Sequence, residues 1–417
     1  MESFIRALIM FAYLIALYFV VFWLLVLFEK KPEQNQKPLK QFPFVTILIP
    51  AYNEEKKITS TLKSILKLDY PKNKLDFIVV NDGSTDNTLQ LIKDVIHENK
   101  EFKIRLINQK NHGKGAALNK GLKEAKGEFF ICLDADSYVK EDSLKKLLPY
   151  FDKKDIACVL PVMKVRSPGN FLQKMQWFEY IVNMFYKELM GRLDCIHVTP
   201  GPFSIYRTSI LKKVGCFDED HNLTEDLEIA LRLQSKNYKI IQALEGEVST
   251  ISPKTIKSLY DQRNRWYKGS ILNAFKYGKM MFNKKYGDFG IIQMPVIIIS
   301  GVIAVIIITA LFYYNIWRPF GEFIKMRYID FDFLTLIKTF TFDFHILDLD
   351  FTSISLAIIM LIISVFIFTK SHVVLKEKVN KHGILSSVIY LLSYFVLLGI
   401  IWIGILVELM IGKKQRW

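Results

Sequence analysis

Cysteine is scarce in this chain, with four among 417 residues, and none of the four belongs to a CxxC pair. A structural zinc site or a disulfide framework needs closer, paired cysteines, so neither is expected. We interpret the four as reduced thiols of a cytosolic domain. They are Cys132, Cys158, Cys195 and Cys216.

Internal repeats and low-complexity tracts are absent, and so is any compact basic run interleaved with aromatic residues. The formal net charge is nevertheless +15. Because many lysines flank apolar segments or are scattered over the central region, we attribute this charge to the lysine enrichment of cytoplasmic loops. No nucleic-acid partner is predicted.

Charged residues are missing from residues 289–314 and 351–369, and residues 4–28 contain only Arg6. Residues 383–411 are interrupted only by Glu408. Each segment is long enough to cross about 30 Å of hydrocarbon as a helix. About four transmembrane helices are therefore predicted, in an integral protein of the cell membrane with membrane lipids as partners.

The first apolar segment is either a signal peptide or a retained anchor. Its apolar run exceeds a normal signal-peptide core, and no small-residue cleavage site follows before Glu29, so we expect an anchor. Lysines of the linker and of the 370–382 loop then place the central domain in the cytoplasm. The same count of spans puts Lys413, Lys414 and Arg416 outside, against this rule.

From residue 44, short apolar runs alternate with stretches of helical periodicity. This alternation predicts a mainly parallel, Rossmann-like α/β sheet flanked by helices, with a ligand crevice at the carboxyl ends of the strands. The predicted strands are 45–49, 77–80, 104–107 and 129–133, and the predicted helices are 54–68, 86–98 and 114–126.

Residues 170–193 place most of their large apolar side chains on one helical face. This pattern fits an interfacial helix lying on the membrane, and equally an ordinary amphipathic helix packed on the sheet. The predicted organisation is transmembrane helix 1 (1–28), linker (29–43), cytosolic domain (44–250), interfacial region (251–288), transmembrane helix 2 (289–316), external loop (317–350), transmembrane helix 3 (351–369), cytosolic loop (370–382) and transmembrane helix 4 (383–411).

Two aspartates, Asp134 and Asp136, directly follow a predicted buried strand. Strand alternation can aim both carboxylates into the crevice, where Mg²⁺ or Mn²⁺ could bridge them to a diphosphate. Their alternative role is that of two solvated acids in a turn. Other DxD matches, such as Asp218-Glu219-Asp220, follow no such strand.

Asp82 ends the second predicted strand, so its carboxylate either meets a base edge or ribose hydroxyl, or orders the local turn. Lys114 lies in the glycine-containing stretch Asn111-His112-Gly113-Lys114-Gly115 and could bind a phosphate as a point charge. Glycosyl transfer with inversion needs a base for the acceptor hydroxyl. Asp226, next to Glu225, is the candidate, and its alternative role is an acid in a first helical turn capped by Thr224.

The stretch Gln262-Arg263-Asn264-Arg265-Trp266 lies about two dozen residues before an apolar segment. On a helix, Gln262, Arg265 and Trp266 share a face, whereas Arg263 points elsewhere. Arginine suits phosphate and tryptophan suits a sugar ring, although Trp266 could also be an interfacial anchor.

With these motifs in order, residues 44–269 resemble the processive family 2 glycosyltransferases. These are membrane-embedded GT-A enzymes such as poly-N-acetylglucosamine, cellulose and hyaluronan synthases. The resemblance rests on Pro50-Ala51-Tyr52-Asn53-Glu54, Asn81-Asp82-Gly83-Ser84, Asp134-Ala135-Asp136, Thr224-Glu225-Asp226 and the 262–266 pentapeptide. Asn81 stands where the commoner form has an aspartate.

The resemblance implies a role for each matching residue. Those expected to bind the nucleotide-sugar are Tyr52, Glu54, Asp82, Asp134, Asp136 and Arg265, together with Lys114 from the glycine-containing stretch described above. Asp136 would also hold the metal, and Asp226 and Glu225 would form the catalytic pair with Asp226 as base. Gly201, Gln262 and Trp266 would shape the acceptor site.

The expected activity is transfer from a UDP-sugar to a growing polysaccharide, with export of the product. Two alternatives stay open, namely single-sugar transfer to a lipid carrier such as polyprenyl phosphate, and a non-catalytic nucleotide-binding membrane subunit. The span count is lower than in cellulose synthase, so a homo-oligomer or an accessory subunit is a further expected partner.

Overall fold

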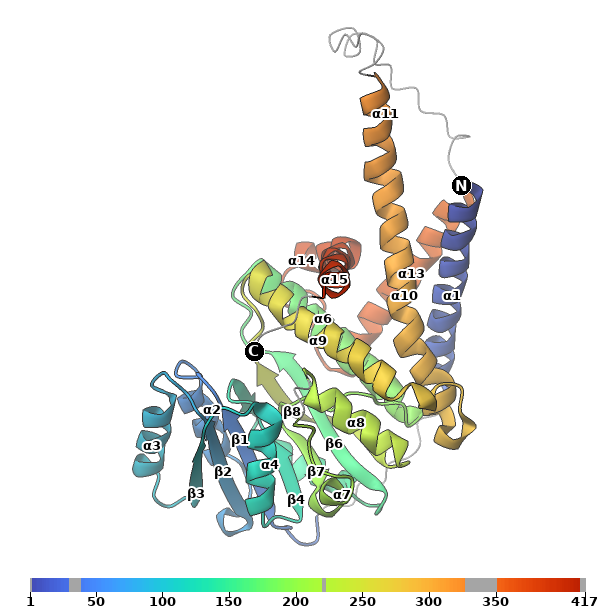
Figure 1. Ribbon diagram of the computed structural model, residues 1–417. Helices are drawn as coiled ribbons and strands as arrows, with labels where there is room; N and C mark the ends of the chain where they lie inside the picture. Colours follow the sequence, from blue (N-terminus) through green and yellow to red (C-terminus); the bar gives the residue numbers. More distant parts are fainter. Residues whose placement is uncertain (1, 30–38, 220–222, 327–350, 413–417) are drawn as a thin grey trace.

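The computed structural model describes residues 2–29, 39–219, 223–326 and 351–412. Figure 1 shows three layers. The first is a sheet domain, the second consists of helices α6 (Phe171–Arg192) and α9 (Ile256–Lys276), and the third consists of long helices that extend away from them. Those long helices are α1 (Glu2–Phe28), α10 (Met294–Phe312), α11 (Arg318–Met326) and α13 (Phe351–Val374).

Within the described residues, eight strands form one sheet in the order β3-β2-β1-β4-β7-β6-β8-β5. The first four are mutually parallel, β7 and β5 run antiparallel to their neighbours, and β6 pairs with β8 in parallel. The strands are β1 (Val45–Ala51), β2 (Leu75–Asp82), β3 (Ile104–Gln109), β4 (Phe129–Cys132), β5 (Ser137–Val139), β6 (Ile156–Val165), β7 (Ser204–Arg207) and β8 (Lys239–Thr250).

Successive residues of the central strands bury their side chains on opposite faces of the sheet. Ile47 and Ile49 of β1 belong to one core cluster, and Leu48 between them belongs to another, as the two-residue strand period requires. Helices α2 (Ile58–Leu66), α3 (Thr88–Glu98) and α5 (Ser143–Leu147) cover the first face. Helices α4 (Lys114–Glu124), α7 (Thr208–Lys213) and α8 (Glu225–Ser235) cover the second.

The predicted mainly parallel α/β fold is confirmed, and all four predicted strands are present. Helix α2, however, begins at Ile58 rather than at residue 54. The preceding residues are held in a turn, because Asn53 has a φ of 54° and the Glu54 N–H donates to Thr88 Oγ1 at 2.7 Å. Hydrogen bonds to the next βα loop therefore replace the first helical turn.

Helix α6 is buried on two sides at once. Trp177, Phe178 and Ile181 pack in a cluster with Val162 and Val165 of β6, while Phe185 and Leu189 pack with Trp23 of α1. Its N-terminus is capped by Asn170, whose Oδ1 accepts the Gln173 N–H at 2.9 Å. The helix thus joins the sheet domain to the long helices, and its position at a membrane surface stays a prediction.

Three helical stretches are long and apolar enough to cross a membrane, judged by length and composition within the described residues. They are Met10–Phe28, Ile354–Val374 and Ile384–Met410. The predicted span at 289–316 lies in one uninterrupted helical run, formed by Phe289–Gln293, α10, Tyr313–Trp317 and α11. Most of the predicted 29–43 linker and 317–350 loop lies outside the described residues.

A buried ion pair links helices α6 and α9. The Arg263 guanidinium of α9 donates to both carboxylate oxygens of Glu179 on α6, each at 2.7 Å, and Tyr394 donates to the same carboxylate at 2.9 Å. Arg263 and Glu179 are 4% and 7% exposed. The free-energy cost of burying these two charges is offset by their mutual attraction and hydrogen bonds.

Replacing Glu179 by alanine would leave the Arg263 charge buried without its carboxylate. We expect a loss of about 3–5 kcal/mol in the free energy of unfolding, measured by denaturant unfolding in detergent micelles. The control is Asp69→Ala, which removes the exposed Lys145–Asp69 pair and should cost less than about 1 kcal/mol. Equal losses for the two variants would contradict a buried pair.

Candidate active site

A pocket of about 640 Å³ opens at the carboxyl ends of the parallel strands. It brings together residues that lie up to 216 positions apart, from Pro50 of β1 to Trp266 on α9. Every residue predicted to bind donor, metal or acceptor, or to act as the catalytic pair, lines it. The lining includes Tyr52, Glu54, Asp82, Lys114, Asp134, Asp136, Gly201, Glu225, Asp226, Gln262, Arg265 and Trp266.

Asp82 orders a loop in this structure. Its carboxylate accepts the backbone N–H groups of His112 and Gly113 at 3.1 and 3.0 Å and the Gln109 side chain at 2.7 Å. These contacts hold the loop that begins α4, and therefore Lys114, against the end of β2. A structural role for Asp82 is thus present, and contact with a nucleotide stays a prediction.

Two lysines pair with four of the acidic side chains that line the pocket. Lys114 Nζ lies 2.7 Å from both Asp134 and Glu225, and Lys57 Nζ lies 3.2 Å from Glu54 and 3.6 Å from Asp136. Burial disfavours the charged form of Lys114, but the two carboxylates outweigh it and hold the Lys114 pKa well above its usual range. The lysines allow these acids to be gathered in one pocket.

The two aspartates that follow β4 have different surroundings. Burial, and then the like charge of Asp134, raise the pKa of Asp136. Asp136 also accepts hydrogen bonds from Ser137 and Thr250 at 3.2 and 3.3 Å. Asp136 is therefore anchored to β5 and β8, whereas Asp134 is bound by Lys114 and faces Gly201.

The absence of a side chain at Gly201 leaves room for the Asp134 carboxylate. A β-carbon at Gly201 would lie 2.5 Å from both carboxylate oxygens of Asp134, a distance that real β-carbons do not reach. The 200–204 loop therefore packs directly against the Asp134 carboxylate, a contact that the sequence of the loop does not reveal.

Asp226 lies in the first turn of α8, at the bottom of the pocket. Its backbone carbonyl accepts two hydrogen bonds from Thr199, and its Oδ1 accepts the Leu227 N–H at 2.8 Å. Burial, and then the Glu225 carboxylate, raise the pKa of Asp226 to about 7. Thr224 does not cap the helix with its side chain, contrary to the alternative above, and its hydroxyl instead accepts from Asn273 of α9.

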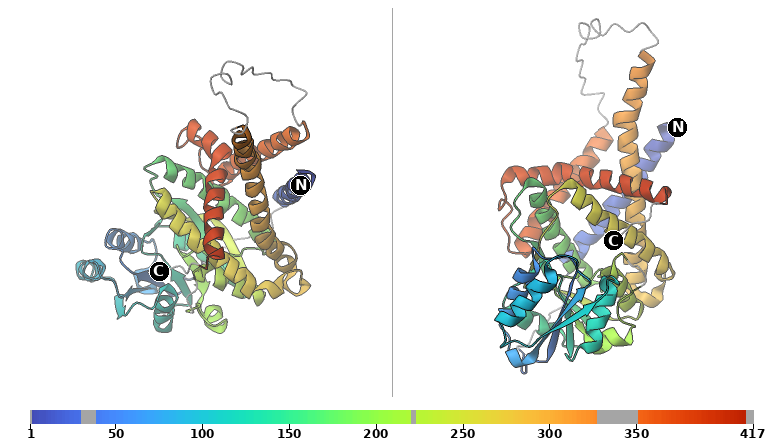
Figure 2. Two further views of the ribbon diagram at one scale, coloured as in Figure 1. Left: turned by 45° about the horizontal axis from the view of Figure 1, so that its top comes forward. Right: turned by 60° about the vertical axis from the view of Figure 1, so that its left-hand side comes forward.

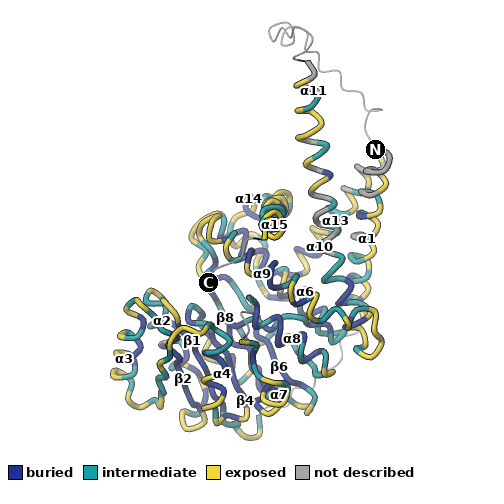
Figure 3. Tube along the Cα trace, viewed as in Figure 1, coloured by how far each residue is buried: buried dark blue, intermediate teal, exposed yellow. Residues whose placement is uncertain are grey.

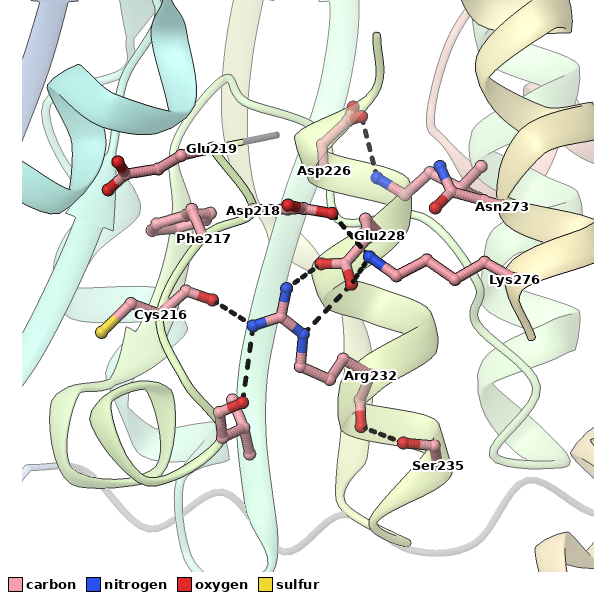
Figure 4. Close-up of polar contacts among 12 residues, drawn as sticks. Cys216, Phe217, Asp218, Glu219, Asp226, Glu228, Arg232, Ser235, Asn273 and Lys276 are labelled. Atoms are coloured by element: carbon pink, nitrogen blue, oxygen red, sulfur yellow. Dashed lines mark hydrogen bonds and ion pairs between the residues drawn. The ribbon is translucent and has the colours of Figure 1, made fainter. Parts of the chain in front are cut away.

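Polar contacts fasten α8 to α9 (Figure 4). Lys276 of α9 donates to Asp218 at 2.6 Å and to Glu228 of α8 at 3.1 Å. The fully buried Glu228 also pairs with Arg232, which donates in turn to the Cys216 carbonyl at 2.8 Å. These contacts set the distance between the Asp226 carboxylate and the pocket face of α9.

Helix α9 presents the pentapeptide as the three-to-four-residue spacing predicted. Gln262, Arg265 and Trp266 line the pocket, whereas Arg263 turns away to Glu179 and lies under the Trp266 ring at 4.5 Å. The Gln262 Oε1 atom is buried and has no hydrogen-bond partner within the described residues. An acceptor hydroxyl could supply one.

Several pocket residues were missed by sequence reasoning. Lys57, which does not line the pocket but pairs with Glu54 and Asp136 of its lining, was also missed, although it lies only three residues after Glu54. Asp218 and Glu219 line the pocket, although their DxD match was set aside because no strand precedes it. Tyr180 of α6 also lines it and carries no local signal.

The fold is that of GT-A glycosyltransferases. The whole chain is similar in structure to a mannosyltransferase from Pyrobaculum calidifontis solved with GDP-Man and Mn²⁺. The TM-score is 0.64 at 17% identity, over 99% of both chains. Such identity supports the fold alone.

Residues 46–215 match the family described as Glycosyl transferase family 2, so this part of the chain is a family 2 glycosyltransferase domain. The chain is 32% identical over 262 residues to the poly-β-1,6-N-acetyl-D-glucosamine synthase of Staphylococcus epidermidis, covering 61% of this chain and 62% of the relative. It is 33% identical over 244 residues to the synthase of Staphylococcus aureus strain COL, covering 58% and 57%. The match thus spans less than two thirds of these relatives.

Adding a methyl group at Gly201 should displace the Asp134 carboxylate. We expect Gly201→Ala to lower the transfer rate by about 100-fold, because a misplacement of about 1 Å in a catalytic site has that effect. The matched control is Gly278→Ala, where an added β-carbon meets nothing within 4 Å. Equal activity of both variants would contradict the close approach.

The Asp226 carboxylate can accept a proton only when it is ionised. Since its pKa is raised to about 7, kcat/KM for transfer should fall about tenfold per pH unit below that value and level off above it. A pH–rate profile at saturating metal ion measures this, with nucleotide binding followed at each pH as the control. A flat profile down to pH 5 would exclude Asp226 as the titrating base.

Proposed function

We propose that this protein is a membrane-embedded inverting glycosyltransferase that adds N-acetylglucosamine from UDP-N-acetylglucosamine to a growing polysaccharide. The observation that carries the proposal is the pocket itself, which unites the strand-end acids, Asp226 and the Gln262/Arg265/Trp266 face of α9. The donor sugar and the polymer product are supported by similarity to the staphylococcal synthases. The membrane location is supported by the apolar helices.

In the proposed reaction, the acceptor hydroxyl lies between Asp226 and the anomeric carbon of the donor. Asp226 takes the hydroxyl proton while the new C–O bond forms, and the bond to the diphosphate breaks on the opposite side, leaving UDP with the electron pair. Arg265 and Lys114 are proposed to neutralise the departing diphosphate. Gln262 and Trp266 orient the acceptor sugar.

The carboxylates of Asp134 and Asp136 are hard oxygen ligands and fit Mg²⁺ or Mn²⁺. Within the described residues, no group of three or more His, Cys, Asp or Glu side chains is arranged to hold a metal ion. The fit therefore relies on diphosphate and water oxygens to complete the coordination shell, as magnesium sites commonly do. When bound, the cation would supply charge neutralisation of the leaving group.

Product analysis separates this proposal from its alternatives. Purified protein in nanodiscs with radiolabelled UDP-N-acetylglucosamine and Mn²⁺ should release UDP and form a heterogeneous polymer. A single-sugar product extractable into organic solvent would indicate transfer to a lipid carrier instead. Nucleotide binding without UDP release for any donor or acceptor would identify a non-catalytic subunit. Export, and the need for a second copy or an accessory subunit, stay predictions.

Replacing the base should separate chemistry from binding. We expect Asp226→Asn to lower transfer by at least about 100-fold, because the amide cannot accept the acceptor proton, with UDP affinity kept within about threefold. Asp261→Asn, at an exposed aspartate on the same helix as the pentapeptide, is the matched control and should leave transfer unchanged. Unaltered turnover in Asp226→Asn would remove it as the base.

A further inference from the structure

The apolar segment Ile384–Met410 touches the domain side of the protein at both of its ends. Just before it, Glu377 pairs with Lys164 of β6 at 2.8 Å. Near its end, Glu408 accepts hydrogen bonds from Asn264 and Lys268 of α9 at 2.8 and 2.9 Å. A helix that crosses a bilayer carries its two ends about 30 Å apart along the membrane normal, so these contacts do not fit a crossing.

The middle of the segment follows the same layer. It consists of α14 (Ile384–Ile389), residues Tyr390–Tyr394 and α15 (Phe395–Met410). Tyr394 binds Glu179 of α6, and Trp402 stacks on Tyr267 of α9 with ring centroids 4.4 Å apart. Between Tyr394 and Glu408 the helix advances about 21 Å, all of it in contact with the α6/α9 layer. Figure 2 shows α14 and α15 running across α10 rather than beside it.

The two faces of this segment differ in what covers them. The face toward α6 and α9 is packed against protein, with Ile401 and Ile405 buried beside Tyr394 and Glu408, whereas the outer face is apolar and exposed. Figure 3 shows exposed residues along α15. The large apolar side chains exposed there include Leu392 (55%), Phe395 (59%), Ile400 (62%), Val407 (47%) and Met410 (88%). An exposed apolar surface of this kind, beside membrane-length helices, is suited to contact lipid acyl chains.

We propose that Ile384–Met410 lies in the plane of the membrane on its cytoplasmic side, does not cross it, and places its outer face among lipid acyl chains. The crossing helices are then α1, the α10–α11 run and α13. Contact of α15 with α10 makes the apolar surface continuous with these helices. The segment covers α9 from the membrane side, directly behind the residues that line the pocket.

This arrangement also accounts for the positive charges that follow the segment. With a fourth crossing, Lys413, Lys414 and Arg416 would lie outside. With an in-plane segment, they share the cytoplasmic side with the lysines of the 370–382 loop, as the positive-inside rule favours. This inference takes only one point from the proposed function, namely that the pocket lies on the cytoplasmic side of the membrane.

Cysteine labelling in the full-length protein tests the side of the C-terminus. Lys414→Cys, in a Cys216→Ser background, should react with a membrane-impermeant maleimide from the cytoplasmic side only. Lys378→Cys is the cytoplasmic control and Glu2→Cys the external one. Labelling of Lys414→Cys from the outside, alone or together with the inside, would overturn the proposal. The readout needs no transfer activity, so it stands apart from a failure of the proposed function.

Depth measurement tests the orientation directly. Spin labels at Phe395, Ile400 and Val407 should lie at the same depth in the membrane to within about 5 Å, the pitch of one helical turn. All three should be accessible to oxygen. A crossing helix would instead separate the first and last labels by about 18 Å in depth. That gradient would refute the in-plane orientation. Labels protected from both oxygen and water-soluble relaxants would mean that a second copy of the protein covers this face, which would also refute it.

Discussion

The pocket depends on keeping several carboxylates together in a partly buried space. Carboxylates so placed repel one another and lose hydration, and a cation between them offsets both costs. Lys114 between Asp134 and Glu225, and Lys57 between Glu54 and Asp136, supply that compensation. A bound metal ion could take the place of a lysine beside these acids, because both are cations.

Helix α9 is the second element on which the site depends, because it brings Gln262, Arg265 and Trp266 to the strand-end acids. It is held by polar contacts on three sides: Arg263 to Glu179 of α6, Lys276 to Glu228 of α8, and Lys268 to Glu408 of α15. The Arg263–Glu179 pair is buried, so displacement of α9 would leave these two charges without each other. The position of Trp266 is therefore fixed by residues that never touch a substrate.

Much of this organisation could be predicted from the sequence. Strand periodicity placed Asp82 and Asp134 at the ends of β2 and β4, and parallel pairing of these strands with β1 brings such ends to one edge. Helical spacing separated Arg263 from Arg265. The predicted start of α2 was wrong by four residues, because the Glu54 N–H donates to Thr88 at the start of α3, and no local pattern reports such a contact. Lys57 and Gly201 were missed as partners of Asp136 and Asp134 for the same reason.

The sequence by itself determined the α/β alternation, the acidic strand ends, the shared face of the pentapeptide and the presence of membrane-length apolar segments. These properties follow from local periodicity and composition. Only the tertiary structure decided which lysine pairs with which acid, that Arg263 belongs to Glu179, and how Ile384–Met410 lies. A helix that crosses a membrane and one that lies flat in it can share length and hydropathy, and the contacts along the helix and at its two ends tell them apart.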